Sequence, residues 1–492
     1  MKNLRKILEN VEYELVKGSL DIEIKDIKNN SRSVEPDDLF IAIVGTTADS
    51  HTFIPDAIQN GATVVVIEKE VEITENITVI KVASSRKALA YMSAAYFDYP
   101  AKDLTTIGIT GTAGKTSTSY MLKAMLERQG KKVGLIGTIC ALIGDKKIEL
   151  HNTTPESYDV QKMFRQMIDA GCQYALMEVS SQGLKMHRVD GFTFDYGVFT
   201  NISPEHIGPN EHESFEEYLY CKSLLFQKCR IGIINTDSNR WQDVVKNHTC
   251  EIITYGASEQ KTDIKASNIE FIMENDFLGM GFTVSGKLEG NVKVSIPGRF
   301  SVYNSLCAMT IANELGVSLE HMKEALENIK VTGRMELASS NENYKLIIDY
   351  AHNEDEMNNL MDTISEYQPE RLVCIFGGGG NRAKARRYDM GEVAGKWADL
   401  IILTEDNPRW EELDSINQDI IEGIRRSQGK YIIVNNRKEA IKYAMQNAEK
   451  GDMILLIGKG HENYQEIRGV RYPWDERKAV KEAEQELENT AK

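Results

Sequence analysis

The sequence predicts an α/β protein built from three consecutive modules, and three observations support this class. Its 492 residues suit about three domains of ordinary size. Short apolar runs rich in β-branched residues alternate with segments of helical spacing, the order that produces parallel sheets covered by helices. One such run is followed by a glycine-rich turn and another helical segment. Together these features favour α/β domains over helical bundles or β-sandwiches.

The first module is expected to cover residues 1–100. Strands are predicted at Leu39–Val44, Ala62–Ile67 and Thr78–Val82, with helical patterns between them, which indicates a small α/β domain. The first ten residues have the pattern of a short amphipathic helix. Tyr99-Pro100 is a suitable linker to the next module.

The second module is expected to cover residues 101–332. It opens with the apolar run Leu104–Ile109, and further strands are predicted at Tyr174–Val179, Tyr196–Thr200 and Gly232–Asn235. This alternation predicts a mostly parallel sheet with helices on both faces. A stretch of β character over 264–294 and a helix over 319–329 complete the module.

The third module, residues 333–492, has the clearest strand order. Strands are predicted at Leu346–Asp349, Leu372–Phe376, Leu400–Thr404 and Met453–Ile457, and each runs into a loop rich in glycine or charge. Ligands of open α/β sheets bind at the carboxyl ends of the strands. The four loops are therefore expected to form a ligand site on one edge of the sheet.

Composition restricts the class of partner and the compartment. The net charge of −16 argues against nucleic acid as the main partner, since phosphate backbones attract basic surfaces. Seven scattered cysteines without a Cys-x-x-Cys pair indicate reduced thiols in a cytoplasmic protein rather than a disulfide framework or a zinc site. The N-terminus lacks the features of a signal peptide, and no run of 18 apolar residues could span a membrane.

The glycine-rich turn is the most informative motif. Residues 109–117 read I-T-G-T-A-G-K-T-S, directly after the strand at 104–109. Such a turn offers backbone N–H groups and a positive helix end to phosphate oxygens, while Lys115 can reach terminal phosphates and Thr116 can bind magnesium. The loop is shorter than the usual P-loop pattern, and a chance Gly-Lys-Thr is the alternative. Its position between strand and helix favours phosphate binding.

Four further side chains are candidates that their local sequence alone would not establish. Glu178 ends a strand on the same predicted sheet as the loop, where a metal-binding carboxylate would lie, although a lone strand-end glutamate is commonly just solvated. His206 follows another strand, and a lone histidine is more often structural. Lys222 lies on a predicted amphipathic helix from which a lysine can extend to solvent.

The fourth candidate is Arg409, in Asp406-Asn407-Pro408-Arg409. Proline fixes the turn, and an arginine fork can grip a carboxylate through two parallel hydrogen bonds. Arg382 follows a neighbouring strand and could join it. Two arginines in one pocket would indicate a substrate with a carboxylate, whereas surface ion pairing is the more common role of arginine.

Taken together, these motifs resemble the Mur ligase family of peptidoglycan synthesis over nearly the whole chain. The segments that carry the resemblance occur in family order: S-R-S-V-E-P-D-D-L-F (31–40), N-T-T-P (152–155), M-E-V-S-S (177–181), H-R-V (187–189), F-T-N (199–201), G-R-M-E (333–336), D-Y-A-H (349–352), D-N-P-R (406–409) and G-K-G-H-E (458–462). The resemblance implies an N-terminal UDP-binding α/β domain, a central P-loop ATPase domain and a Rossmann-like C-terminal domain. The D-N-P-R form resembles the branch that adds diaminopimelate to UDP-N-acetylmuramoyl-L-alanyl-D-glutamate.

The resemblance also implies roles for individual residues. Four are expected to be catalytic: Lys115, Glu178, His206 and Lys222. Of these, Glu178, His206 and Lys222 would organise magnesium together with Thr116, and Lys222 matches a lysine that is carbamylated in this family. The residues that would bind ATP are Gly111, Thr112, Ala113, Gly114, Lys115, Thr116, Ser117, Asn304, Arg334, Asp349 and His352.

The remaining implied roles concern the two other substrates. The UDP-linked acceptor would contact Ser31, Thr46, Thr47, Ala48, Thr153, Thr154, Ser180 and Arg188. The incoming amino acid would contact Arg382, Asp406, Asn407, Pro408, Arg409, Gly458 and Glu462.

The resulting prediction is a cytoplasmic, monomeric ligase that uses ATP and Mg²⁺ and has neither a membrane nor a nucleic-acid partner. This chain departs from the family pattern at Ala113, Gln182, Met186 and around Arg382, mostly near the acceptor and amino-acid sites. Two alternatives therefore stay open. One is a related ligase with another amino acid, such as lysine, or another acceptor. The other is a non-catalytic nucleotide-binding scaffold.

Overall fold

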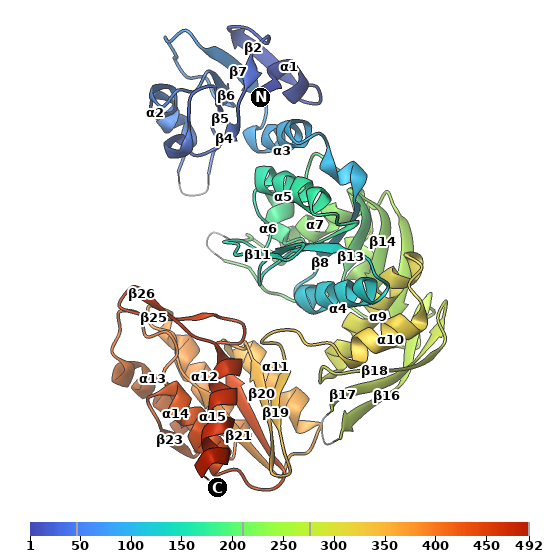
Figure 1. Ribbon diagram of the computed structural model, residues 1–492, viewed down its shortest axis with the longest axis vertical. Coiled ribbons are helices and arrows are strands. Elements are labelled where there is room, and N and C mark those ends of the chain that lie inside the picture. The colour runs from blue at the N-terminus through green and yellow to red at the C-terminus, as the bar shows by residue number, and fades with distance from the viewer. Residues whose placement is uncertain (46–47, 209–210, 275–276, 491–492) are drawn as a thin grey trace. The chain divides into compact units, whose positions relative to one another are not determined.

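The computed structural model describes residues 1–45, 48–208, 211–274 and 277–490 and confirms the predicted mixed α/β class (Figure 1). The chain forms two compact units. The first comprises residues 1–265, 286–288 and 306–322, and the second comprises 266–285, 289–305 and 323–492. None of the helices among the described residues combines the length and apolar character needed to cross a membrane.

The N-terminal part of the first unit is a five-stranded sheet in the order β2-β7-β6-β5-β4. β4 to β7 are mutually parallel, and β2 runs antiparallel to β7. Helices α1 (Leu4–Ile7) and α3 (Ser85–Tyr96) contribute to one of the two cores around this sheet, and α2 (Ile54–Gln59) contributes to the other. The strands are β2 (Tyr13–Lys17), β4 (Ile27–Lys28), β5 (Leu39–Ile41), β6 (Val64–Ile67) and β7 (Thr78–Val82).

The first ten residues differ from the single amphipathic helix that the sequence predicts. β1 (Lys2–Asn3) pairs with β3 (Glu23–Ile24), and α1 has only four residues. Asn3 caps α1 by accepting a hydrogen bond from the backbone N–H of Arg5. Strand pairing thus takes the first residues out of the helix, while Leu4 and Ile7 are still fully buried, as the apolar spacing requires.

The second sheet of this unit holds the phosphate loop. Within this unit its strands follow the order β11-β10-β9-β12-β8-β13-β14-β15. The six strands β9, β12, β8, β13, β14 and β15 are parallel, whereas β10 is antiparallel to both of its neighbours. Helix α4 packs on β8, β9 and β12. The strands are β8 (Thr105–Thr110), β9 (Val133–Ile136), β10 (Ala141–Ile143), β11 (Lys146–Ile148), β12 (Tyr174–Glu178), β13 (Phe194–Phe199), β14 (Cys229–Asn235) and β15 (Glu251–Gly256), and the helices are α4 (Lys115–Arg128), α5 (Ser157–Asp169), α6 (Ser181–Lys185), α7 (Phe215–Ser223) and α8 (Trp241–Val244).

The predicted β region at 264–294 forms β16 (Ile264–Met273), β17 (Leu278–Gly286) and β18 (Gly290–Val294), with β17 antiparallel to β18. Two helices follow, α9 (Arg299–Glu314) and α10 (Leu319–Glu327). The predicted helix over 319–329 therefore forms but ends two residues earlier.

The C-terminal sheet of the second unit has the order β19-β20-β24-β21-β22-β23. Its five strands β20 to β24 are parallel, so the loops after β20, β21, β22 and β24 leave the same edge, as the sequence predicts. The strands are β19 (Glu336–Ser340), β20 (Tyr344–Asp349), β21 (Arg371–Phe376), β22 (Leu400–Leu403), β23 (Tyr431–Ile433) and β24 (Asp452–Ile457), and the hairpin β25 (Tyr464–Ile467) and β26 (Val470–Pro473) follows. The helices are α11 (Glu354–Ser365), α12 (Lys384–Trp397), α13 (Leu413–Ser427), α14 (Arg437–Gln446) and α15 (Glu476–Thr490).

A fully buried ion pair lies beside the end of β24. The Arg437 guanidinium donates to Glu476 Oε1 and, at 2.9 Å, to the carbonyl oxygen of Ile457. Neither side chain is exposed to solvent. The pair therefore connects the first turns of α14 and α15 to the last residue of β24, just before the G-K-G-H-E loop.

Glu476→Ala is expected to lower the free energy of unfolding by about 3–5 kcal/mol, since it leaves a buried guanidinium without its counter-charge. Chemical denaturation followed by circular dichroism measures this loss. The matched control is Glu482→Ala on the same helix, whose partner Lys438 is solvent-accessible and whose loss should change stability little. Equal losses for the two variants would contradict the role given to the buried pair.

Candidate active site

The phosphate loop lies between β8 and α4, and its glycines are sterically required. Gly111 has φ +155°, and a Cβ there would lie 1.9 Å from Thr200 Oγ1. Gly114 takes the left-handed conformation at the start of α4, with φ +84°. The backbone of Ala113 donates to Asn201 Oδ1 and accepts from the side chains of Thr200 and Asn201. The loop is thus held by main-chain contacts at Ala113, which explains how alanine can occupy this position.

Two lysines meet at the loop. Lys115 Nζ donates to the carbonyl oxygens of Gly111 and Thr112, at 2.8 and 2.9 Å. Lys222 Nζ, from α7, donates to the same Gly111 oxygen at 2.8 Å and lies 4.4 Å from the centre of the Tyr218 ring. Lys222 is 1% exposed, so it does not extend to solvent. Burial lowers the pKa of Lys222 well below its usual value, and the charge of Lys115 lowers it further.

Glu178, at the end of β12, is fully buried beside the same loop. Its carboxylate accepts hydrogen bonds from Thr116 Oγ1 at 3.0 Å and from the backbone and hydroxyl of Thr138 at 3.2 and 2.9 Å. A carboxylate and a hydroxyl in contact are the hard oxygen donors that Mg²⁺ prefers. Thr116 and Glu178 therefore fit a magnesium ion.

His206 is the most exposed of the four catalytic candidates. Its side chain is 54% exposed, and Nδ1 pairs with Glu211 at 3.2 Å. The ring lies 5.9 Å from that of Tyr218, and the Tyr218 hydroxyl is 3.0 Å from Thr112 Oγ1. Tyr218, which the sequence did not single out, thus contacts His206, Lys222 and the phosphate loop.

Four of the eight predicted acceptor residues lie together around the end of β12. Thr154 Oγ1 donates to the carbonyl oxygen of Glu178 and accepts from the N–H of Ser180, both at 2.9 Å. Arg188 donates to the carbonyl oxygen of Thr154 at 2.9 Å and pairs with Glu156 at 2.8 Å. Thr153 Oγ1 lies 3.0 Å from the hydroxyl of Thr138. These contacts connect Thr153, Thr154, Ser180 and Arg188 to the magnesium candidates.

The uridine-nucleotide candidates lie in the N-terminal part. Ser31 is buried, and its carbonyl oxygen accepts from the Asn60 side chain at 3.0 Å. The carbonyl oxygen of Ala48 accepts from the N–H of Gly45 at 2.9 Å. Thr46 and Thr47 lie outside the described residues.

In the second unit, a cavity of about 310 Å³ lies at the carboxyl ends of the C-terminal strands. Arg409 Nη1 donates to the carbonyl oxygen of Gly380 at 2.7 Å, and its Nε lies 3.4 Å from Glu466. The cavity wall includes six of the seven predicted amino-acid-binding residues: Arg382, Asp406, Asn407, Arg409, Gly458 and Glu462. Both arginines thus line one pocket, with acidic groups beside them.

Asn407 is held by Glu462, which the sequence predicted as a site residue, and by Lys459 and Glu466, which it did not. Its amide nitrogen donates to Glu462 at 2.8 Å, and its oxygen accepts from Lys459 Nζ at 3.0 Å and from the N–H of Glu466 at 2.8 Å. Lys459 is fully buried. Because both ends of the Asn407 side chain have partners, its role fits positioning of the turn that carries Arg409.

Arg387 is a second residue that the sequence did not identify. It is 2% exposed, pairs with Glu411 and Asp419, and donates to the carbonyl oxygen of Gly379 at 2.9 Å. The hydrogen bond from Arg387 holds the pKa of Glu411 down at about 2. These bonds hold the glycine-rich loop after β21 in place, and the glycines of this loop line the cavity.

The predicted ATP-side residues of this unit gather around the end of β20. Asp349 is buried, and its carboxylate accepts from the N–H groups of Met335 and Ala351, both at 2.8 Å. The Arg334 guanidinium lies 5.2 Å from the centre of the Tyr350 ring. His352 pairs with Glu356 at 3.0 Å, and this bond raises the pKa of His352. Asn304, on α9, is 5% exposed.

Three Mur ligase profiles match successive parts of the chain. The "Mur ligase family, catalytic domain" matches residues 23–102, the "Mur ligase middle domain" matches 109–312, and the "Mur ligase, glutamate ligase domain" matches 333–460. With its α/β units and phosphate loop, the chain belongs to the Mur ligase family.

Within this family, the chain is similar to enzymes named UDP-N-acetylmuramoyl-L-alanyl-D-glutamate–2,6-diaminopimelate ligase. It is 43% identical to the one from Caldanaerobacter subterraneus subsp. tengcongensis, over 97% of this chain and 98% of the relative. It is also 43% identical to ligase 1 from Clostridium acetobutylicum, over 98% of this chain and 99% of the relative. A solved structure of a ligase with the same name has a TM-score of 0.74 and 27% identity, covering 99% of this chain and all of the other.

Proposed function

We propose that this chain is an ATP-dependent amide ligase of peptidoglycan synthesis. It joins 2,6-diaminopimelate, as the meso form, to the D-glutamate of UDP-N-acetylmuramoyl-L-alanyl-D-glutamate. The full-length likeness to two ligases with this activity in their names supports the choice of substrates. We further propose three domains at 1–100, 101–332 and 333–492, and a cytoplasmic monomer that works without a membrane or nucleic-acid partner.

The observation that carries the choice of amino acid is the pocket with Arg382 and Arg409. Diaminopimelate has a carboxylate on its distal carbon that lysine lacks. An arginine fork satisfies this group with two charge-assisted hydrogen bonds. Lysine would leave the fork without that partner, at a cost of several kcal/mol. The acidic side chains Asp406 and Glu462 complement the ammonium groups of the same amino acid.

In the proposed reaction, an oxygen of the D-glutamate γ-carboxylate bonds to the γ-phosphorus of ATP, and the bond from that phosphorus to the ADP oxygen breaks. The neutral amine of diaminopimelate then attacks the acyl carbon. The tetrahedral intermediate releases inorganic phosphate and a proton, which leaves an amide. Lys115 and the N–H groups at the start of α4 face the charge that develops on the phosphoryl oxygens.

Thr116 and Glu178 would hold Mg²⁺, with His206 and a carbamylated Lys222 completing the set. When bound, the ion neutralises charge on the phosphate oxygens. Carbamylation needs a neutral amine, which attacks carbon dioxide and loses a proton to form an N-carboxylate. The burial of Lys222 and the nearby positive charge of Lys115 favour the neutral amine.

Lys222→Ala is expected to reduce the rate of amide formation at least about 100-fold, since an anionic group near the metal is lost. A direct measurement is ¹³C NMR of the protein equilibrated with ¹³C-bicarbonate. The wild-type protein should show one carbamate resonance that Lys222→Ala lacks and that Lys123→Ala, a surface change on α4, retains. A carbamate signal that survives in Lys222→Ala, or none in the wild type, would rule out this modification.

Two alternative functions predict different results in a phosphate-release assay. A related ligase with another amino acid or acceptor would release phosphate with that substrate instead. A non-catalytic scaffold would release no phosphate with any combination, although the retained Lys115, Glu178, His206 and Lys222 speak against it. Phosphate release that requires both the UDP-linked dipeptide and diaminopimelate is the result that the proposal expects.

A further inference from the structure

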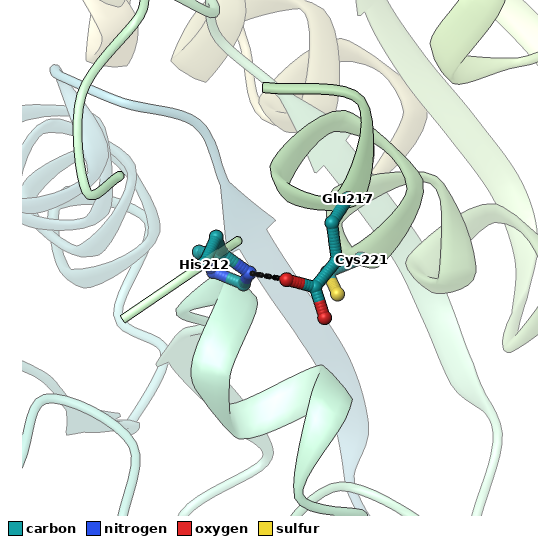
Figure 2. A group of neighbouring side chains, drawn as sticks. All are labelled: His212, Glu217 and Cys221. Carbon is teal, nitrogen blue, oxygen red and sulfur yellow. Dashed lines mark ion pairs between the residues drawn. The ribbon is translucent and has the colours of Figure 1, made fainter. Parts of the chain in front are cut away.

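Three potential metal ligands converge beside helix α7, apart from the magnesium candidates (Figure 2). Glu217 and Cys221 lie one helical turn apart on α7, and His212 precedes the helix. Their ligand atoms all lie within 4.8 Å of one another. No other group of three such side chains is found in the described part of the chain. His212 is fully buried, and Cys221 is 3% exposed.

The imidazole of His212 is oriented for metal binding. Its Nε2 lies 2.8 Å from Ser181 Oγ, so this nitrogen can carry the proton and donate to the hydroxyl. Nδ1 is buried and has no hydrogen bond, and it faces Glu217 at 3.6 Å, a distance too long for one. Histidines that bind metals commonly donate their other N–H to such a partner. Ser181 thus leaves the Nδ1 lone pair directed toward Glu217 and Cys221.

The carboxylate of Glu217 has its two oxygens in different roles. Oε1 pairs with Lys185 at 2.6 Å, whereas Oε2 accepts from the N–H of Glu213 and is the oxygen nearest His212 Nδ1. A metal ion could therefore bind Oε2 without breaking the ion pair with Lys185. Figure 2 shows this carboxylate between the His212 ring and the Cys221 sulfur.

The donor set indicates which metal fits. One imidazole nitrogen, one carboxylate oxygen and one sulfur suit Zn²⁺, while Mg²⁺ prefers oxygen alone. Three protein ligands leave the fourth tetrahedral position to water. The sequence argued against a zinc site because it has no Cys-x-x-Cys pair, but that motif identifies only sites with paired cysteines. Here a single cysteine lies beside a histidine and a glutamate.

We propose that His212 Nδ1, Glu217 Oε2 and Cys221 Sγ bind one zinc ion. Binding forms a zinc–sulfur bond and breaks the Cys221 S–H bond, whose proton passes to solvent, with no change of oxidation state. The ion ties His212 to α7, the helix that also carries Tyr218 and Lys222. It is a positioning site for that helix, and it does not depend on the substrates proposed above.

Cobalt titration of the full-length, chelator-treated protein tests the site, because Co²⁺ reports thiolate coordination by absorption. The expected result is one equivalent bound, with a sulfur-to-cobalt charge-transfer band that Zn²⁺ abolishes and millimolar Mg²⁺ does not. Cys221→Ser should remove the band, and His212→Ala should weaken affinity at least about 100-fold. Ser181→Ala should weaken it about tenfold, as loss of the imidazole's hydrogen-bond partner predicts.

Cys250→Ser is the matched control, since Cys250 is a partly exposed thiol outside the cluster. It should keep the stoichiometry, the band and the rise in unfolding temperature that zinc produces. Should Cys221→Ser fold poorly, Glu217→Gln keeps the thiol and is expected to retain the band with weaker affinity. A wild-type protein without the band, a band that survives in Cys221→Ser, or equal loss in Cys250→Ser would overturn the proposal. Because no substrate is present, none of these results bears on the ligase reaction.

Discussion

Lys115→Ala is expected to reduce ATP-dependent phosphate release roughly 1,000-fold, because a single cation directed at developing phosphoryl charge contributes on this scale. Lys115 Nζ is held by two loop carbonyl oxygens, those of Gly111 and Thr112, within 3 Å. The ammonium group thus lies against the backbone of the phosphate loop. Steady-state phosphate release with saturating acceptor and diaminopimelate measures the effect.

The control for this variant is Lys123→Ala, two turns further along α4. Lys123 is partly exposed and forms an i,i+4 pair with the exposed Glu127. It should retain near wild-type phosphate release and the same unfolding transition. Comparable losses in both variants would mean that general destabilisation of α4, rather than phosphate contact, explains the Lys115 result.

Arg409→Lys is expected to reduce kcat/KM for diaminopimelate about 100-fold and to leave KM for ATP unchanged. Lysine keeps the positive charge but loses the fork that grips a carboxylate with two hydrogen bonds. Arg409 is fixed by Gly380 and Glu466, so a flexible lysine would also lose this orientation. Initial rates over a range of each substrate separate the two effects.

Arg468→Lys is the matched control, because the backbone N–H of Arg468 donates to the carbonyl oxygen of Arg409, whereas its side chain is 73% exposed and pairs with the exposed Glu412. It should leave both KM values unchanged. If Arg409→Lys raises KM for ATP as much as that for diaminopimelate, the pocket is not the amino-acid site. A variant that prefers lysine as substrate would support the assignment more strongly.

The sequence predicted the strands and loops at the candidate-site edges of both main sheets well, because hydrophobic periodicity and turn composition are local signals. The loops after β20, β21, β22 and β24 follow buried parallel strands, whose apolar runs are continuous and easy to locate. The phosphate loop was identifiable since Gly111 and Gly114 have backbone conformations that favour glycine. Exposed strand β2 was missed, as its residues 13–16 are solvent-exposed and show no apolar face.

Residues that act through long-range contacts could not be predicted from one sequence. In the sequence, Arg387 is one of several basic residues on α12. Its ion pairs with Glu411 and Asp419 become apparent only in the folded structure. Lys459 belongs to the G-K-G-H-E motif that the sequence analysis identified. Its buried contact with Asn407 nevertheless forms only because the loops after β22 and β24 leave the same edge of the sheet. The His212, Glu217 and Cys221 cluster depends likewise on the turn that precedes α7.

The most direct test of the central claim is the ratio of kcat/KM for meso-diaminopimelate to that for L-lysine, with the UDP-linked dipeptide and ATP saturating. The proposed arginine pocket predicts a ratio of at least about 1,000, since lysine lacks the distal carboxylate that the arginines would bind. Mass spectrometry of the product should show the tripeptide that carries diaminopimelate. A ratio near one, or product formed only with lysine, would contradict the account.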